Sequence, residues 1–387
     1  MSVLGIAPTE LAHRAARIAT ELAGPHAAEV DRDARFPAEA IDAMRAEGLL
    51  SALVPVDLGG AGATVGEVAQ MTRVLGTQCS STALIFAMHH MQVACVVRHG
   101  HTPLLRDFQA ELAESQLLLG SATTELGIGG DIRTSLCSVE RSGGRFSLEK
   151  QAPVISYGVY ADAIMTTARR SAESPPADQV LVLCRPPGLV LEQLSPWDTL
   201  GFRGTCSPGF KLTAEGDEAQ VLPVPFSDIS AATMLPVAHV LWSSAWLGIA
   251  TASVERARRF VRAEARKKPG VTPPGATRLA ELTAAHQQMS ELVNGLARRY
   301  DAICDDPDAM SRMGFAIAMN NLKVSASTMV VDIVGRALAI CGMAGYRLDT
   351  PYSMGRLLRD AHGAALMVNN DRIIGNNAQM LLVSKDD

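Results

Sequence analysis

The chain has 387 residues, of which 48% are hydrophobic and 19% are charged, and its formal net charge is −5. A chain of this length suits two or three domains and can bury a large core. The absence of any basic run argues against nucleic acid as a main partner. The seven cysteines are scattered without disulfide-framework or metal-ligand spacing, so we expect no metal site.

The N-terminal residues, MSVLGIAPTELAHRAARIA, lack a basic region followed by an apolar core, so we predict no signal peptide. The most apolar stretch, 234–252, contains His, Ser and Trp and is better explained as a core helix than as a membrane span. We therefore expect a soluble, cytoplasmic protein without a membrane partner.

The N-terminal part of the chain shows helical periodicity, interrupted by turn residues such as Gly48 and the Gly59-Gly60-x-Gly62 loop. The helix predicted over 80–98 contains the pair His89-His90, for which a buried, hydrogen-bonded pair is the simplest explanation. The pattern predicts helices over 9–30, 37–48, 64–77, 80–98 and 103–114.

The periodicity changes from Leu117 onward, where short β-branched runs are separated by Gly, Pro and Ser. Ser142-Gly143-Gly144 stands between two alternating runs and predicts a hairpin turn. From Thr233 the pattern is helical again and predicts a bundle. We predict domains at 1–116, 117–228 and 229–387, with C-terminal helices over 233–266, 276–304, 308–341, 351–360 and 363–382.

Residues 341–373 read CGMAGYRLDTPYSMGRLLRDAHGAALMVNNDRI. This segment resembles the C-terminal signature of the flavin-dependent acyl-CoA dehydrogenases, in which a Gly-Gly-x-Gly-Tyr turn, an Arg-Asp-Ala segment and a Glu-Gly-Thr tripeptide follow one another. Three further segments resemble the flavin-contacting loops of that family, in the same order. They are TELGIGGD at 124–131, VIS at 154–156 and GFRGT at 201–205.

The resemblance covers nearly the whole chain and implies an α+β fold of three parts. These parts are an N-terminal helical domain, a central β-barrel or sandwich domain and a C-terminal bundle of four-helix type. It also implies FAD as the cofactor and a homodimer or homotetramer, because the family Arg equivalent to Arg266 holds the FAD of the neighbouring subunit. The cofactor-binding residues implied in this way are Thr123, Thr124, Gly130, Ile155, Ser156, Arg266, Gly342 and Asn370.

In that family a Glu removes the α-proton of an acyl thioester while the β-hydrogen leaves as a hydride to the flavin. Counting from Ala361 places this Glu at residue 368, which is Val in this chain. Candidates for a relocated base are Asp371, His239 and His89, and a buried structural role is the alternative for each histidine.

Three functions follow from these expectations. The first is FAD-dependent α,β-dehydrogenation of an acyl-CoA or acyl-carrier-protein thioester with a non-standard base, passing electrons to a flavoprotein or to O₂. The second is a flavin-dependent monooxygenase or oxidase on the same fold, to which the changes at Gly130, Val154 and Pro269 also point. The third is a non-redox homologue that binds acyl thioesters.

Overall fold

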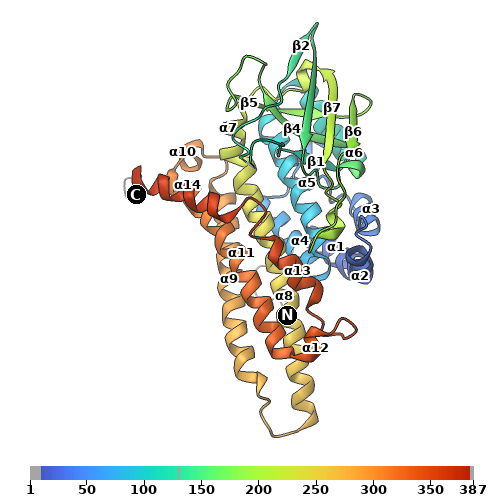
Figure 1. Ribbon diagram of the computed structural model, residues 1–387, viewed down its shortest axis with the longest axis vertical. Helices are drawn as coiled ribbons and strands as arrows, with labels where there is room; N and C mark the ends of the chain where they lie inside the picture. The colour runs from blue at the N-terminus through green and yellow to red at the C-terminus, as the bar shows by residue number, and fades with distance from the viewer. Residues whose placement is uncertain (1–9, 130, 384–387) are drawn as a thin grey trace.

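The computed structural model describes residues 10–129 and 131–383. Along the chain, helices are followed by strands and then by helices again (Figure 1). They form an N-terminal helical domain, a central β-sheet domain and a C-terminal helical domain, which confirms the predicted fold class. The first strand begins at Leu119 and the last ends at Asp217, whereas the predicted domain limits themselves stay a prediction.

Helix starts in the N-terminal domain follow local capping chemistry. The Thr64 hydroxyl accepts a hydrogen bond from the Glu67 N–H, and the Glu67 carboxylate accepts one from the Thr64 N–H. Thr102 caps the last helix of the domain in a similar way, just before Pro103. The helices are α1 (Glu10–Ile18), α2 (Gly24–Arg32), joined to α1 through a π-helical segment Ala19–Ala23, α3 (Ala38–Ala46), α4 (Val65–Gln78), α5 (Ser80–His99) and α6 (Pro103–Ser115).

Helix α5 runs through the middle of the molecule and is buried on every face from Ser80 to Val96. The Leu119 N–H donates a hydrogen bond to His89 Nδ1 at 3.0 Å, so the hydrogen of the neutral ring is on Nε2. This Nε2–H donates to the Leu50 carbonyl at 2.6 Å. The His90 ring lies 3.0 Å from the Phe86 carbonyl through Nδ1. Both histidines are therefore hydrogen-bonded core residues, as predicted from the sequence.

The central domain contains two sheets, with strand orders β1-β4-β5 and β2-β3-β7-β6. Strands β1 and β4 are parallel and the other pairs are antiparallel. The predicted hairpin turn is confirmed, because Gly143 and Gly144 have φ of 57° and 75° between β2 and β3. The strands are β1 (Leu119–Ala122), β2 (Glu140–Ser142), β3 (Arg145–Ala152), β4 (Ala163–Arg169), β5 (Gln179–Cys184), β6 (Leu189–Gln193) and β7 (Phe210–Asp217).

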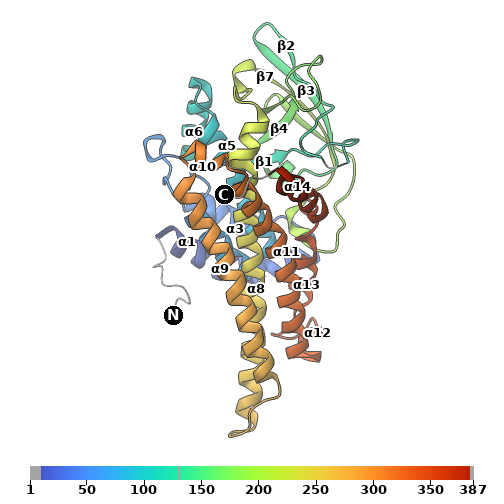
Figure 2. The same ribbon diagram turned by 90° about the vertical axis from the view of Figure 1, so that its left-hand side faces the viewer.

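The C-terminal domain is built on α8, which packs against α4 and α5 of the N-terminal domain and against α9 and α11 of its own. Helices α8 and α9 form a long hairpin that extends away from the β domain (Figures 1 and 2). The helices are α7 (Phe226–Ile229), α8 (Leu235–Lys267), which follows a π-helical segment Ser230–Met234, α9 (Gly275–Ile303), α10 (Pro307–Met310), α11 (Met313–Cys341), α12 (Met343–Tyr346), α13 (Gly355–Gly363) and α14 (Asn370–Val383).

Three predicted helices differ from the structure. The helix predicted over 351–360 begins only at Gly355 and continues to Gly363. The helix predicted over 308–341 is two helices, because the chain leaves helical geometry at Arg312, with ψ of 132°. The helix predicted over 363–382 begins only at Asn370, because Val368 has φ of 52° and a right-handed helix cannot continue through it. Residues 364–369 therefore form turns.

Three helical stretches are long and apolar enough to cross a membrane when judged by length and composition alone: Ser80–His99, Phe226–Lys267 and Met313–Cys341. In the first two, 94% of the most apolar window is buried inside the protein, against 44% in the third. Burial in the protein core accounts for the apolar character of the first two stretches.

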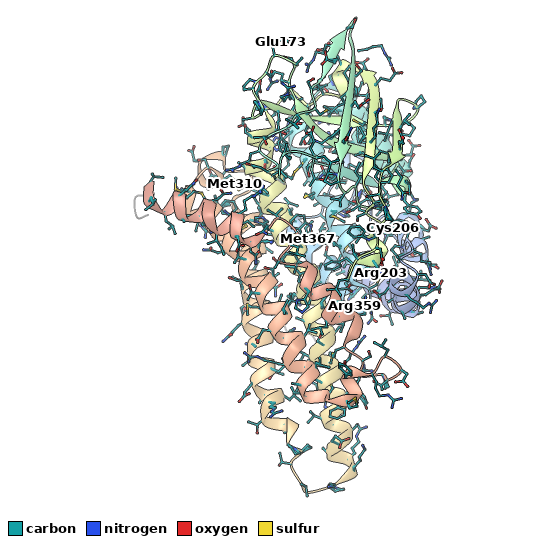
Figure 3. The ribbon with its side chains drawn as sticks, in the orientation of Figure 1. Glu173, Arg203, Cys206, Met310, Arg359 and Met367 are labelled. Carbon is teal, nitrogen blue, oxygen red and sulfur yellow. The ribbon has the colours of Figure 1, made fainter. Side chains whose placement is uncertain are left out.

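A buried carboxylate on α13 joins the three domains. Asp360 accepts hydrogen bonds from the Phe202 N–H, at 2.6 Å, and from the hydroxyl of Ser80 at the start of α5. Its neighbour Arg359, labelled in Figure 3, forms an ion pair with Asp31 at the end of α2. The Arg-Asp segment thus fixes the C-terminal domain against the other two.

Candidate functional site

A cavity of about 200 Å³ lies where the β domain meets α5, α8 and the segment between α13 and α14. Met367, labelled in Figure 3, belongs to that segment. Thr123, Thr124, Ser156 and Val368, which the sequence places at the flavin and the substrate, all line this cavity. Its other lining residues are Met88, Met91, Ser121, Ile132, Val154, Tyr157, Met234, Leu235, Ala238, Trp242 and Met367.

The loop that carries Thr124 is anchored by a buried carboxylate, that of Glu125. Glu125 accepts hydrogen bonds from the N–H groups of Cys137, at 2.7 Å, and Leu136, at 3.1 Å. Its carboxylate also lies 3.5 Å from the ammonium of Lys150, which is buried on β3. Because these contacts use both carboxylate oxygens, Glu125 has a structural role, and Thr123 and Thr124 are left at the cavity wall.

The segment 154–156 places one hydroxyl at the cavity. Ile155 is fully buried in the core of the β domain, whereas the next side chain, Ser156, lines the cavity. The Ser207 hydroxyl donates to Ser156 at 2.9 Å and lies 2.8 Å from the hydroxyl of Thr205. Ser156 thus keeps its own hydroxyl hydrogen to donate to a ligand.

Val368 is held in a conformation that β-branched residues rarely adopt, with φ of 52°. The ammonium of Lys323 on α11 donates to its carbonyl at 2.6 Å and to Asn370 Oδ1 at 2.7 Å. Within the described part of the chain, the Val368 N–H has no acceptor. The lysine therefore anchors the peptide on one side and leaves a backbone donor at the cavity wall.

Lys323 is a residue that the sequence reasoning missed. It is fully buried, burial lowers its pKa to about 8, and no carboxylate within residues 10–129 and 131–383 pairs with it. Its ammonium lies 5.9 Å from the ring centroid of Trp246. A signal was present, because Lys323 is the only charged residue between Arg312 and Asp332 of an apolar helix.

None of the three candidate bases lines the cavity. Burial lowers the pKa of His89 to about 4, and both of its ring nitrogens are hydrogen-bonded. Burial and the charge of Lys323 lower the pKa of His239 to about 3, and its Nδ1 lies 3.1 Å from the Met319 carbonyl. Asp371 is exposed at the start of α14.

The cavity fits a flavin ring, which is flat, largely apolar and polar along one edge. Thr123, Thr124 and Ser156 supply hydroxyl groups, and Met and Trp side chains supply apolar cover. The indole Nε1 of Trp242 is buried without an acceptor among the residues that the structure describes. This donor is therefore available to a molecule bound in the cavity.

The remaining predicted flavin contacts lie elsewhere. Asn370 is held by Lys323 and Ser327 next to the cavity. Gly342 is exposed at the end of α11, and Gly130 lies outside the described residues. Arg266 is exposed about 24 residues beyond Trp242 on α8, or roughly 36 Å along the helix. Arg266 therefore cannot reach the cavity of its own chain, and its contact with the flavin of a second copy stays a prediction.

Comparison with known proteins finds two matching family descriptions. Residues 8–116 match "Acyl-CoA dehydrogenase, N-terminal domain" and residues 230–368 match "Acyl-CoA dehydrogenase, C-terminal domain", together more than half of the chain.

Two relatives in sequence are similar over most of the chain. Cyclohex-1-ene-1-carbonyl-CoA dehydrogenase of Syntrophus aciditrophicus is 25% identical, over 90% of this chain and 83% of the relative. The probable FMNH2-dependent monooxygenase SfnC of Pseudomonas putida is 27% identical, over 84% of each chain. In structure, FMN-bound TdsC of Paenibacillus sp. A11-2 superposes with a TM-score of 0.85 at 19% identity, over 98% of each chain.

Proposed function

This chain belongs to the acyl-CoA dehydrogenase superfamily of flavoproteins, and we propose that it is a monooxygenase that uses reduced flavin and O₂. One observation carries the proposal: the residues lining the cavity include no carboxylate, imidazole or amine. Similarity to a probable FMNH2-dependent monooxygenase also supports it, whereas similarity to an acyl-CoA dehydrogenase keeps the other reaction open to test.

Dehydrogenation between Cα and Cβ of a thioester needs a group that removes the α-proton. A positioned general base contributes about 10²- to 10⁴-fold to such a step. The cavity side chains are hydroxyl, indole, thioether and alkyl groups, and none of them is a base at neutral pH. Oxygen insertion places no such demand on the protein, because the reduced flavin supplies the oxidising chemistry with O₂ when it is bound.

The residues of the chain then have three tasks. Thr123, Thr124 and Ser156 would hold the polar edge of the flavin ring through their hydroxyl groups. Met88 and Trp242 would cover the ring and keep water out of the cavity. The N–H of Val368, anchored through Lys323, would donate to the substrate.

An anaerobic titration tests the proposal. The purified protein is titrated with oxidised and reduced FMN and FAD and, separately, with butyryl-CoA and octanoyl-CoA after loading with FAD. We expect reduced flavin to bind at least about ten-fold more tightly than oxidised flavin, and neither thioester to bleach the bound FAD. The comparison of FMN with FAD also identifies the flavin.

The same experiment has outcomes that contradict the proposal. Bleaching of bound FAD by either thioester would show that the chain is a dehydrogenase with a base outside the cavity. Equal affinity for oxidised and reduced flavin, without bleaching, would favour tightly bound FAD in another role. Failure to bind any flavin would favour the non-redox, thioester-binding alternative.

A further inference from the structure

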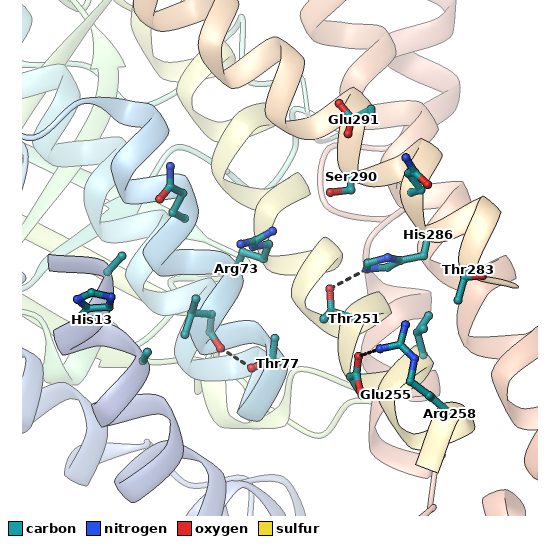
Figure 4. A pocket seen from close by; sticks show the side chains of 16 residues that line it. His13, Arg73, Thr77, Thr251, Glu255, Arg258, Thr283, His286, Ser290 and Glu291 are labelled. Atoms are coloured by element: carbon teal, nitrogen blue, oxygen red, sulfur yellow. Dashed lines mark hydrogen bonds and ion pairs between the residues drawn. The ribbon is translucent and has the colours of Figure 1, made fainter. Parts of the chain in front are cut away.

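A second, larger cavity of about 580 Å³ lies between the N-terminal domain and the C-terminal bundle (Figure 4). Residues of α1 and α4 form one side, and residues of α8 and α9 form the other. It shares no lining residue with the flavin cavity. A volume of this size is typical of sites for small molecules.

Arg73 on α4 is the central charge of this cavity. Figure 4 shows its side chain facing the space between α4 and helices α8 and α9. Its guanidinium makes no hydrogen bond or ion pair within residues 10–129 and 131–383. The side chain is half-buried, and burial lowers the pKa of Arg73.

The other charged groups of the cavity do not compensate Arg73. Glu255 forms an ion pair with Arg258, one turn further along α8. The His286 ring lies 2.9 Å from the Thr251 hydroxyl through Nε2, and burial together with the charge of Arg73 lowers its pKa. His13 and Glu291, the remaining ionisable lining residues, are exposed to solvent.

A half-buried guanidinium without protein partners has five N–H donors available to a ligand, and it is less well hydrated than a fully exposed one. The group most complementary to it is a planar or tetrahedral oxyanion, which accepts two parallel hydrogen bonds. The alkyl groups of Val74 and Val254 beside Arg73 offer apolar contact to the rest of such a molecule.

We propose that this cavity is a second ligand site, in which Arg73 binds the carboxylate or phosphate group of a small molecule. The ligand would contact α4 on one side and α8 and α9 on the other, and would therefore stabilise the packing of the N-terminal domain on the bundle. The proposal does not depend on the reaction at the flavin cavity.

Thermal unfolding and calorimetry of the full chain test it. Sodium phosphate and sodium succinate are compared with sodium chloride at equal ionic strength. We expect one of the two anions to bind with one site per chain and to raise the Tm by about 2–4 °C at saturation. A response to phosphate alone would identify a phosphate ester as the ligand class, and a response to succinate alone would identify a carboxylate.

The variant Arg73→Gln should lose this response and, without added anion, should be at least as stable as the wild type, because an unpaired cation is removed. Arg336→Gln is the matched control, since Arg336 is exposed on α11 and pairs with Asp332. An equal response of wild type and Arg73→Gln, or none in either, would overturn the proposal. So would a lower Tm of Arg73→Gln together with a smaller assembly mass, because Arg73 would then pair with a second copy of the chain.

Discussion

Lys323 anchors the peptide of Val368 at the wall of the flavin cavity. It is fully buried, yet its three donors point to the carbonyl groups of Val368 and Ala365 and to the amide oxygen of Asn370, not to a carboxylate. A buried cation bound only by neutral oxygens is stabilised less than one in an ion pair. Anchoring the peptide at the cavity wall in this way therefore lowers the stability of the folded protein.

This arrangement predicts a pH dependence of stability. The folded-state pKa of Lys323 is about 8, below its ordinary value of 10.5. Below about pH 8 the lysine is charged in both states, and its burial penalty is constant. Between about pH 8 and 10.5 the unfolded chain binds more protons, so the contribution of Lys323 to the free energy of unfolding rises with pH.

Urea unfolding at pH 7.5, 9 and 10 checks this prediction. The unfolding free energy of the wild type minus that of Lys323→Met should increase over that range. The control Lys267→Met, which removes an exposed lysine paired with Glu264, should give a difference that does not increase. If this difference did not change with pH for Lys323→Met, the pKa of Lys323 would not be lowered in the folded protein.

At the level of elements, the loop after β1 depends on the buried pair Glu125 and Lys150. Lys150 also donates to the carbonyl of Thr167 at 2.7 Å, which joins β3 to β4. The pair therefore ties the two sheets of the β domain to the loop that carries Thr124. Removing one member leaves the other charge buried without a counter-charge.

Lys150→Met should therefore lower the free energy of unfolding by about 3–5 kcal/mol. The double variant Glu125→Gln with Lys150→Met should recover part of the loss, because no uncompensated carboxylate remains. Lys211→Met is the matched control on β7, where a more exposed lysine pairs with Glu149, and should leave the free energy of unfolding nearly unchanged. Urea unfolding of the four proteins measures these values. Equal losses in the two single variants would contradict the assignment.

At the scale of the whole molecule, the flavin cavity exists only where the domains meet, so its shape depends on how they are joined. Asp360 is central to this junction, because it accepts hydrogen bonds from the Phe202 N–H of the β domain and the Ser80 hydroxyl of α5. Both donors would be left in the core without an acceptor if the carboxylate were removed.

We expect Asp360→Ala to lower the free energy of unfolding by about 2–5 kcal/mol and to weaken flavin binding, although Asp360 does not line the cavity. Chemical unfolding and a fluorescence titration with FMN and FAD measure the two effects. Asp349→Ala, which removes an exposed carboxylate paired with Arg347, should change neither. Unchanged flavin affinity in Asp360→Ala would show that the junction does not shape the cavity.

The sequence by itself determined the fold class, most helix limits and several residues of the cavity. Thr123, Thr124, Ser156 and Val368 were predictable because they stand at positions that the resemblance to the acyl-CoA dehydrogenases assigns to the flavin or the catalytic base. The hairpin at Gly143-Gly144 and the capped starts of helices such as α4 were predictable for a similar reason, since turns and caps depend on residues close together in the chain.

Only the tertiary structure decided what the cavity contains. Met88 and Trp242 come from helices far apart in sequence, and nothing in the local pattern shows that they meet. The same packing placed His89 and His239 in the core and kept Asp371 outside, because burial and hydrogen bonding depend on neighbours from distant segments. The left-handed backbone at Val368, which delays the start of one predicted helix, is likewise held by a contact with Lys323, 45 residues earlier in the chain.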